Sequence, residues 1–169
     1  RDMTVPEREG GYIDLGRVDR VLHDAATQWI ADFVKLYENG QPLPYPEVRS
    51  LLASLPGDRS FDSYEPALAH VRGPKLPEDT ELMWSEGVLD VEFTYPIQSD
   101  QSRFSIQSRL TRLGQRVNVV MRFQMPGGEE RAFDVHGDPG IVELDPRWHQ
   151  AALRFVKGGF AHILDGIDH

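Results

Sequence analysis

Cysteine is absent from this 169-residue chain. Its absence excludes disulfide bonds, zinc–thiolate sites and thiol catalysis together, and it leaves the redox state of the compartment undetermined. Any metal would therefore have to be held by imidazole and carboxylate groups.

Basic residues and long apolar runs are also scarce. Lys and Arg number 18 against 27 Asp and Glu, which gives a formal net charge of -9. This balance argues against nucleic acid or an anionic membrane surface as a partner, because both require basic patches. No stretch approaches the roughly 20 apolar residues that a membrane span needs.

The usual signatures of hydrolases and nucleotide-binding proteins are missing as well. The chain has no G-x-S-x-G, H-E-x-x-H, P-loop or G-x-G-x-x-G sequence. Because no nucleophile stands out, the sequence predicts a protein that is not an enzyme. An enzyme of another type would need a pocket that contains a perturbed carboxylate or histidine.

What is present indicates one globular domain of the α+β class. Apolar residues follow a helical rhythm over residues 14–37, and residues 47–55 (EVRSLLASL) resemble a short second helix that Pro56-Gly57 closes. From about residue 60 the pattern favours strands, so we expect an antiparallel β-sandwich with one or two N-terminal helices and a C-terminal helix. The candidate strands are 64–71, 80–95, 102–113, 116–125, 130–135 and 140–144.

Three regions follow from this pattern. Residues 1–12 are predicted to form a flexible N-terminal arm, residues 13–145 the helix-plus-sandwich domain, and residues 146–169 a C-terminal helix. Asp145-Pro146 suits a helix start, and an apolar stripe runs from Trp148 through Phe155 to Ile167. We expect the native chain to continue past His169, because such a helix needs something to pack against.

The last eleven residues, GFAHILDGIDH, contain the leading candidate site. On a helix His162, Asp165 and His169 fall at i, i+3 and i+7 and share one face, with Asp168 beside them. Imidazole and carboxylate ligands suit a borderline divalent metal such as Ni²⁺, Co²⁺ or Zn²⁺. The alternative is a polar C-terminal turn of a helix, where His suits the helix dipole.

The same residues carry a family resemblance. His162 is followed after three residues by Gly-x-Asp-His, formed by Gly166, Asp168 and His169. This motif resembles the opening of the first membrane helix in the HupE/UreJ family, which is associated with nickel or cobalt uptake for hydrogenase and urease assembly. The match covers about ten residues, and the preceding 158 are similar only in layout to the extracytoplasmic domain of one branch of that family.

The resemblance implies a periplasmic domain of an integral membrane protein, joined to the membrane through helices beyond His169. Its role would be to assist nickel or cobalt transport, either by capturing the metal or by docking an extracytoplasmic protein partner. The alternative is a stand-alone extracytoplasmic binding module with no transport role. The sequence does not indicate an oligomeric state.

Other chemically active residues have simpler interpretations. His23 and Asp24 are expected to be an exposed helical pair, and His70 a residue on a sheet surface. Asp90 and Glu92 are expected on the outer face of one strand. The D-x-H-x-D cluster of Asp134, His136 and Asp138 suits a turn, and Trp29, Trp84 and Trp148 suit the core.

Overall fold

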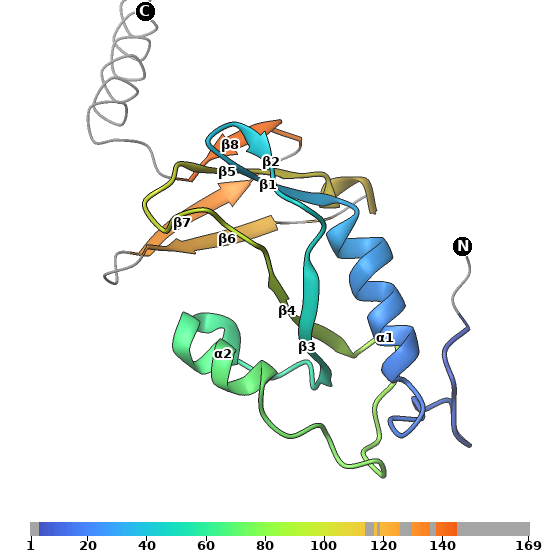
Figure 1. Ribbon diagram of the computed structural model, residues 1–169. Helices are drawn as coiled ribbons and strands as arrows, with labels where there is room; N and C mark the ends of the chain where they lie inside the picture. The colour runs from blue at the N-terminus through green and yellow to red at the C-terminus, as the bar shows by residue number, and fades with distance from the viewer. Residues whose placement is uncertain (1–3, 114–116, 118, 126–129, 136–137, 145–169) are drawn as a thin grey trace, which may run out of the picture.

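The computed structural model describes residues 4–113, 117, 119–125, 130–135 and 138–144. Within these residues the chain combines two α-helices with antiparallel strands in three sheets, of four, two and two strands (Figure 1). The predicted α+β class with antiparallel pairing is therefore confirmed. The predicted helix over residues 146–169 lies outside the described residues.

The N-terminal helical region is shorter than the sequence predicted. Helix α1 (Asp19–Ala25) continues into a π-helical turn, η1 (Ala26–Ala31), and strand β1 (Val34–Glu38) follows directly. The prediction of helix through residue 37 was wrong for this last part. Asn39-Gly40, expected to stop a helix, instead forms a hairpin turn with φ values of 50° and 80°, and leads into β2 (Gln41–Pro42).

The four-stranded sheet has the order β2-β1-β5-β8, with β5 at Phe104–Ser108 and β8 at Ile141–Glu143. A 3₁₀ turn, η3 (Leu110–Leu113), follows β5, so the predicted strand over 102–113 was too long. Strands β6 (Val119–Gln124) and β7 (Glu130–Val135) form a separate hairpin, close to the prediction. A cavity of about 300 Å³ has walls from both this hairpin and the four-stranded sheet.

Strands β3 (Glu47–Ser54) and β4 (Val88–Thr94) form the remaining two-stranded sheet. The prediction of a helix over 47–55 was wrong. The end of β3 buries Leu52, Ala53 and Ser54 in succession, between α1 on one side and α2 on the other. A strand that is covered on both faces loses the alternation that distinguishes it from a helix.

Helix α2 (Tyr64–Val71) replaces the strand predicted over 64–71 and follows a 3₁₀ turn, η2 (Ser60–Asp62). Ser63 precedes the helix with extended backbone angles, and Pro66 lies in its first turn, where a missing N–H costs nothing. Pro66 also argued against a strand, because proline removes a ladder hydrogen bond. Of the strand predicted over 80–95, only Val88–Thr94 forms.

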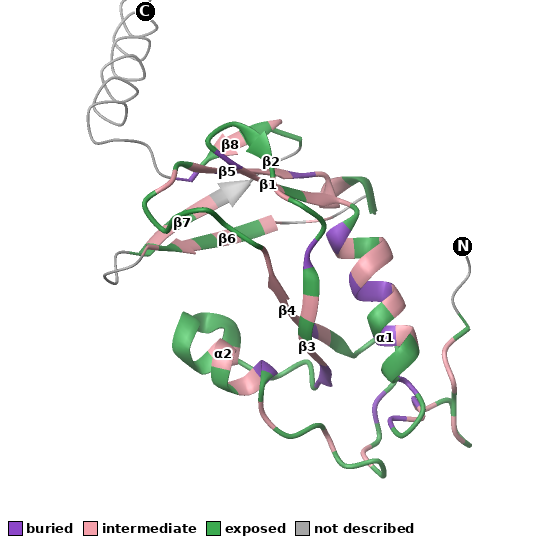
Figure 2. Cartoon of the chain, in the orientation of Figure 1, coloured by how far each residue is buried: buried purple, intermediate pink, exposed green. Residues whose placement is uncertain are grey.

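The densest core lies beside α1 and the end of β3, away from the four-stranded sheet (Figure 2). It also includes Leu82, which comes from the loop before β4. Residues 4–13 contribute to this region: Val5 packs against it, and a bridge pairs Glu7 with Ile13. The buried cluster contains Ile13, Leu15, Val18, Leu22, Ala53 and Leu82.

At the end of β1, Glu38 is a buried carboxylate, 5% exposed, and it ties the loop after β4 to the sheet. Its oxygens accept hydrogen bonds from the backbone N–H groups of Gln98, at 2.9 Å, and Ser99, at 3.1 Å. A side-chain hydrogen bond with Ser102 is the largest cause of a pKa below the usual 4.5, and the two backbone bonds add to it.

We expect this carboxylate to make the fold sensitive to acid. A depressed folded-state pKa contributes stability at pH values above 4.5, and this stability is lost as the pH falls through the folded-state pKa. The melting temperature of Glu38→Gln should therefore lie below wild type at pH 7, and the difference should shrink toward pH 3. Thermal melts of wild type and Glu38→Gln between pH 7 and pH 3 test this prediction, with Glu47→Gln, at an exposed position, as the control. A difference in melting temperature that stays constant across this range would contradict a stabilising role of the Glu38 carboxylate.

Candidate functional site

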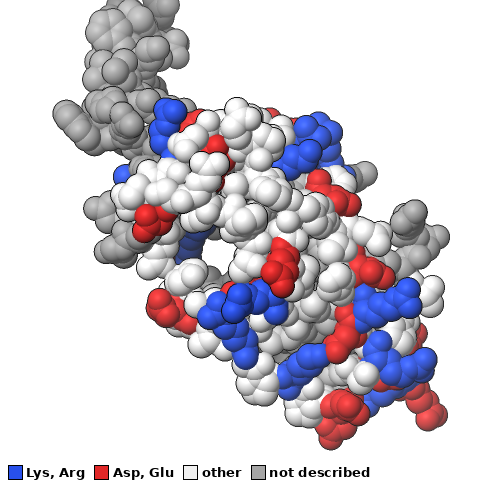
Figure 3. Space-filling model, viewed as in Figure 1, with Lys and Arg blue, Asp and Glu red and all other residues white. Residues whose placement is uncertain are grey.

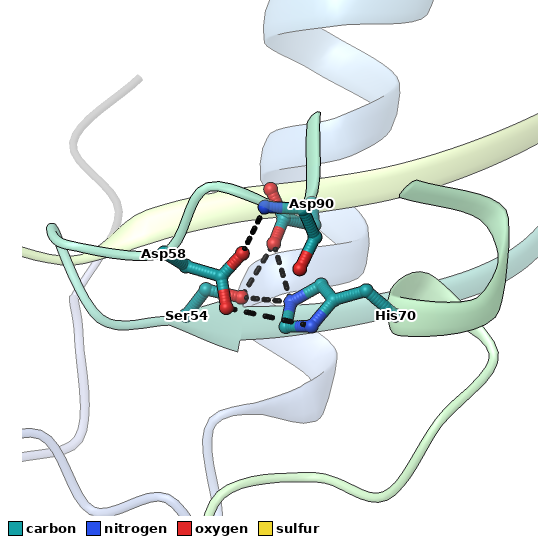
Figure 4. Close-up of polar contacts among 5 residues, drawn as sticks. Ser54, Asp58, His70 and Asp90 are labelled. Atoms are coloured by element: carbon teal, nitrogen blue, oxygen red, sulfur yellow. Dashed lines mark hydrogen bonds and ion pairs between the residues drawn. The ribbon is translucent and has the colours of Figure 1, made fainter. Parts of the chain in front are cut away.

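Three polar side chains from three different elements meet at the end of β3. They are Ser54 from β3, His70 from α2 and Asp90 from β4 (Figure 4). Ser54 Oγ lies 2.8 Å from His70 Nε2, and His70 Nε2 lies 3.1 Å from Asp90 Oδ2. The Ser54 hydroxyl also donates a hydrogen bond to Asp90 Oδ2. Each of the three atoms is therefore within hydrogen-bond reach of the other two.

A second carboxylate lies on the opposite nitrogen of the imidazole. Asp58 Oδ2 is 3.6 Å from His70 Nδ1, an ion-pair distance when the ring is protonated. The pKa of Asp58 lies below its usual 3.8, mainly through hydrogen bonds from the Ser60 side chain and backbone, with a smaller effect of His70. The ring is thus held between two carboxylates, one on each nitrogen (Figure 4).

The fold brings these residues together through strand register and one turn. Leu52 lies opposite Asp90 in the β3–β4 ladder, so Ser54, two residues further along, is a diagonal neighbour of Asp90 on the same face. The Pro56-Gly57 turn, which follows β3, reverses the chain and places Asp58 next to the helix. Ser54 and Asp90 therefore meet because β3 pairs with β4, and not because of the residues next to either of them in the sequence.

A bidentate ion pair anchors the C-terminal end of α2 to β4, two residues after His70. Arg72 Nε donates to Glu92 Oε2 at 2.9 Å, and its terminal nitrogen donates to Oε1. Their hydrogen bond raises the pKa of Arg72 and lowers that of Glu92. Such a two-point contact fixes orientation as well as distance, so His70 has a defined position over the strands.

A pocket of about 600 Å³ opens beside the Ser54–His70 pair. Ser54 itself is 2% exposed, whereas the side chains of His70 and Asp58 are 25% and 31% exposed. Among the described residues that line this pocket there is no Lys or Arg, so its walls favour a neutral or cationic guest. The lining residues are Ser54, Leu55, Pro56, Gly57, Asp58, His70, Leu76, Glu81, Leu82 and Glu86.

A second concave surface lies between α2, β4 and the β6–β7 hairpin, where the molecule is visibly hollowed (Figure 3). Its volume is about 730 Å³. Phe61 and Tyr64 contribute side chains that are 50% and 52% exposed, and Val120 contributes one that is 71% exposed. We call this surface the α2–β6 groove. Exposed apolar side chains gathered in one groove mark a binding surface.

Several predicted site residues lie outside the described residues. The proposed metal ligands His162, Asp165, Asp168 and His169 belong to this group, as does His136. Asp138 is described and pairs with Arg112 at 3.1 Å. In the described part of the chain, no group of three or more His, Asp or Glu side chains is arranged to hold a metal ion.

Three of the simpler interpretations were wrong. His70 lies on a helix, not on a sheet surface, and Asp90 is buried at 5% exposure although an outer-face position was predicted for it. Trp29 and Trp84, expected in the core, are 37% and 36% exposed and meet edge to face at 6.4 Å. His23 is exposed on α1, as predicted.

Comparisons with protein-family models, with curated proteins and with solved structures found no match to this chain. Within the described residues, no helix combines the length and the apolar character needed to cross a membrane.

Proposed function

We propose that this chain is the extracytoplasmic domain of a HupE/UreJ-like membrane protein, and that it docks an extended segment of an extracytoplasmic partner protein during nickel or cobalt uptake. The motif of His162, Gly166, Asp168 and His169 supports the assignment of the parent protein. Docking is the role assigned to the described domain, because the α2–β6 groove gathers exposed apolar side chains on one surface.

The α2–β6 groove is the observation that carries the docking role. Four consecutive residues of β4, 91–94, line it, so the edge of this strand and not one face runs along the groove. In the described sheet β4 pairs only with β3. An edge strand presents unpaired N–H and C=O groups to which an extended peptide can add as a further strand.

The opposite wall would supply side-chain specificity. Val120, Arg122 and Gln124 alternate along β6, are exposed, and line the groove. Arg122 lies 3.9 Å from Glu130, and Arg72 is paired with Glu92, so the charges at the groove are internally matched. The partner segment is therefore expected to present mainly apolar side chains at alternate positions.

We also propose that the β6–β7 hairpin and the four-stranded sheet form the two layers of a β-sandwich. The cavity whose walls come from both sheets supports this arrangement. Val120 lines both that cavity and the groove, so β6 would link the sandwich to the docking surface.

Site-specific photocrosslinking tests the docking role in cells that carry the full-length protein. A photoreactive residue at position 120 is expected to form an adduct with one defined extracytoplasmic protein. The same residue at position 141, another exposed aliphatic position on a strand but outside the groove, is the matched control. Equal adducts at both positions, or none at 120, would exclude the groove as the docking surface.

Val120→Asp should weaken binding of the partner that crosslinks at position 120 and lower nickel or cobalt accumulation, because a desolvated carboxylate would face the apolar segment. We expect at least a tenfold loss of affinity, about 1.4 kcal/mol, with little change in the melting temperature, since Val120 is 71% exposed. Ile141→Asp should leave binding and accumulation unchanged. Unaltered accumulation in Val120→Asp would contradict the role in uptake.

The gene sequence beyond the codon for His169 separates the two readings of the parent protein. About 20 mostly apolar codons rich in Leu and Phe would fit the HupE/UreJ-like protein. A stop codon would leave the same groove in a stand-alone extracytoplasmic binding module.

A further inference from the structure

We propose that Ser54, His70 and Asp58 form a nucleophile, a general base and an orienting carboxylate that hydrolyse small carboxylic esters with a neutral or cationic alcohol part. This activity is independent of the docking role, because it uses the pocket beside Ser54 and not the α2–β6 groove. The supporting pattern is a hydroxyl within hydrogen-bond reach of a base that a third group holds in place.

The distances fit the first half of such a reaction. His70 Nε2 lies 2.8 Å from Ser54 Oγ, so the hydroxyl proton, once turned from Asp90 toward an unprotonated Nε2, can pass to the ring as Oγ attacks the ester carbonyl carbon. The tetrahedral intermediate then collapses: the bond to the alcohol oxygen breaks, and His70 donates its proton to that oxygen. An acyl group remains on Ser54 Oγ.

Water completes the cycle from the same position. His70 Nε2 takes a proton from the water as the water oxygen attacks the acyl carbon, and returns it to Ser54 Oγ when the acyl bond breaks. Ester and water are consumed, and carboxylic acid and alcohol are released. The reaction balances without an oxidant or a cofactor.

The two carboxylates have different tasks in this scheme. Asp58 faces Nδ1 at 3.6 Å and is a positioning residue, because it holds that side of the ring while Nε2 faces Ser54. Asp90 accepts the resting hydroxyl bond of Ser54 and lies 3.1 Å from Nε2. Once the proton has moved, Asp90 faces the positive ring and stabilises it.

The walls of the pocket define the substrate class. Asp58, Glu81 and Glu86 line it together with Leu55, Leu76 and Leu82, a lining that repels an anionic ester and accepts a neutral or cationic one. Ser54 is 2% exposed, so access to Oγ is restricted, and the proposal is limited to the shortest acyl groups, of which acetyl is the one to test.

Hydrolysis by the purified chain tests the proposal with three probes. The probes are neutral p-nitrophenyl acetate, cationic acetylcholine and anionic acetylsalicylate, which share an acetyl group and differ in the charge of the alcohol part. We expect turnover of the first two and little of the third. Ser54→Ala and His70→Ala should each lower kcat/KM by about 100-fold or more. Ser85→Ala, an exposed serine outside the pocket, should match wild type.

Asp58→Asn distinguishes a positioning role from a purely structural one. It should lower kcat with little change in KM, whereas a collapse of the pocket would change both. Because Ser54 is buried, the fold of Ser54→Ala is checked by circular dichroism. A fluorophosphonate probe on wild type gives a second readout, with the adduct expected on Ser54 by peptide mapping.

Three results would overturn the proposal. One is a wild-type chain that hydrolyses none of the probes above the buffer rate. Another is a folded Ser54→Ala that hydrolyses them as fast as wild type. The third is a fluorophosphonate adduct on any residue other than Ser54, which decides the matter even where Ser54→Ala does not fold.

Discussion

Leu82→Ala is expected to lower the free energy of unfolding by about 2–5 kcal/mol, the range for truncating a buried leucine. Leu82 is 1% exposed and belongs to the buried cluster around Ile13 and Leu22. Its backbone carbonyl also accepts the N–H of Ile13 at 2.8 Å, so the surrounding chain is held in place and cannot easily collapse into the space. A cavity that stays open costs the contacts of its whole lining.

Chemical denaturation of the two proteins measures this loss. Leu113→Ala is a matched control, because Leu113 is 45% exposed and the same three carbons are removed there. Its loss should stay near 0.5 kcal/mol or below, as for most surface substitutions. Equal losses for the two variants would mean that the loop before β4 is not part of the core.

The core and the polar site are not separate structures. Leu82 lines the pocket beside Ser54 as well as the core, and Ala53, the residue before Ser54, is buried in the same cluster. Leu82→Ala should therefore also disturb the site, whereas a change at Asp58, on the exposed turn, should leave the core intact. Comparing a change at Leu82 with one at Asp58 therefore separates effects on stability from effects on the proposed ester hydrolysis.

The strands that the sequence placed best are β4 and those of the β6–β7 hairpin. Apolar and polar residues alternate along Val88–Thr94, and a Pro-Gly-Gly sequence separates β6 from β7. The two-residue hydrophobic period and the turn residues therefore both predicted strands in these places. β3 could not be placed in this way. Leu51, Leu52 and Ala53 are good helix formers, and only pairing with β4 across some 40 residues makes them a strand.

The sequence did not predict the polar site, because this site also depends on contacts between residues far apart in the chain. His70 is 16 residues from Ser54 and 20 from Asp90, and no short motif links the three. Their meeting depends on α2, which was taken for a strand, and on β3, which was taken for a helix. Pro66 was the one local signal that could have corrected the first error, since it disfavours a strand and suits a first helical turn.

Asp90→Ala is expected to destabilise the fold by about 2–3 kcal/mol, more than any other change of a single acidic side chain in the site. The Asp90 side chain is 6% exposed, and its Oδ2 is the common partner of Ser54 and His70. Removal leaves the Ser54 hydroxyl, itself 2% exposed, without its carboxylate acceptor. Hydrogen bonds to charged groups contribute about 1.5–3 kcal/mol, and the His70 ring at 2.8 Å from Oγ is the partner that remains for Ser54.

A double-mutant cycle with His70→Ala tests whether the three side chains act as one network. If they do, Asp90→Ala and His70→Ala together should cost less than the sum of the single losses, with a coupling of about 0.5–3 kcal/mol. Asp79→Ala, at an exposed carboxylate, should change stability by no more than about 0.5 kcal/mol. Strict additivity would mean that His70 contributes to α2 packing alone. A measured coupling would show that Asp90 and His70 together hold α2, which also forms one wall of the α2–β6 groove, against β4.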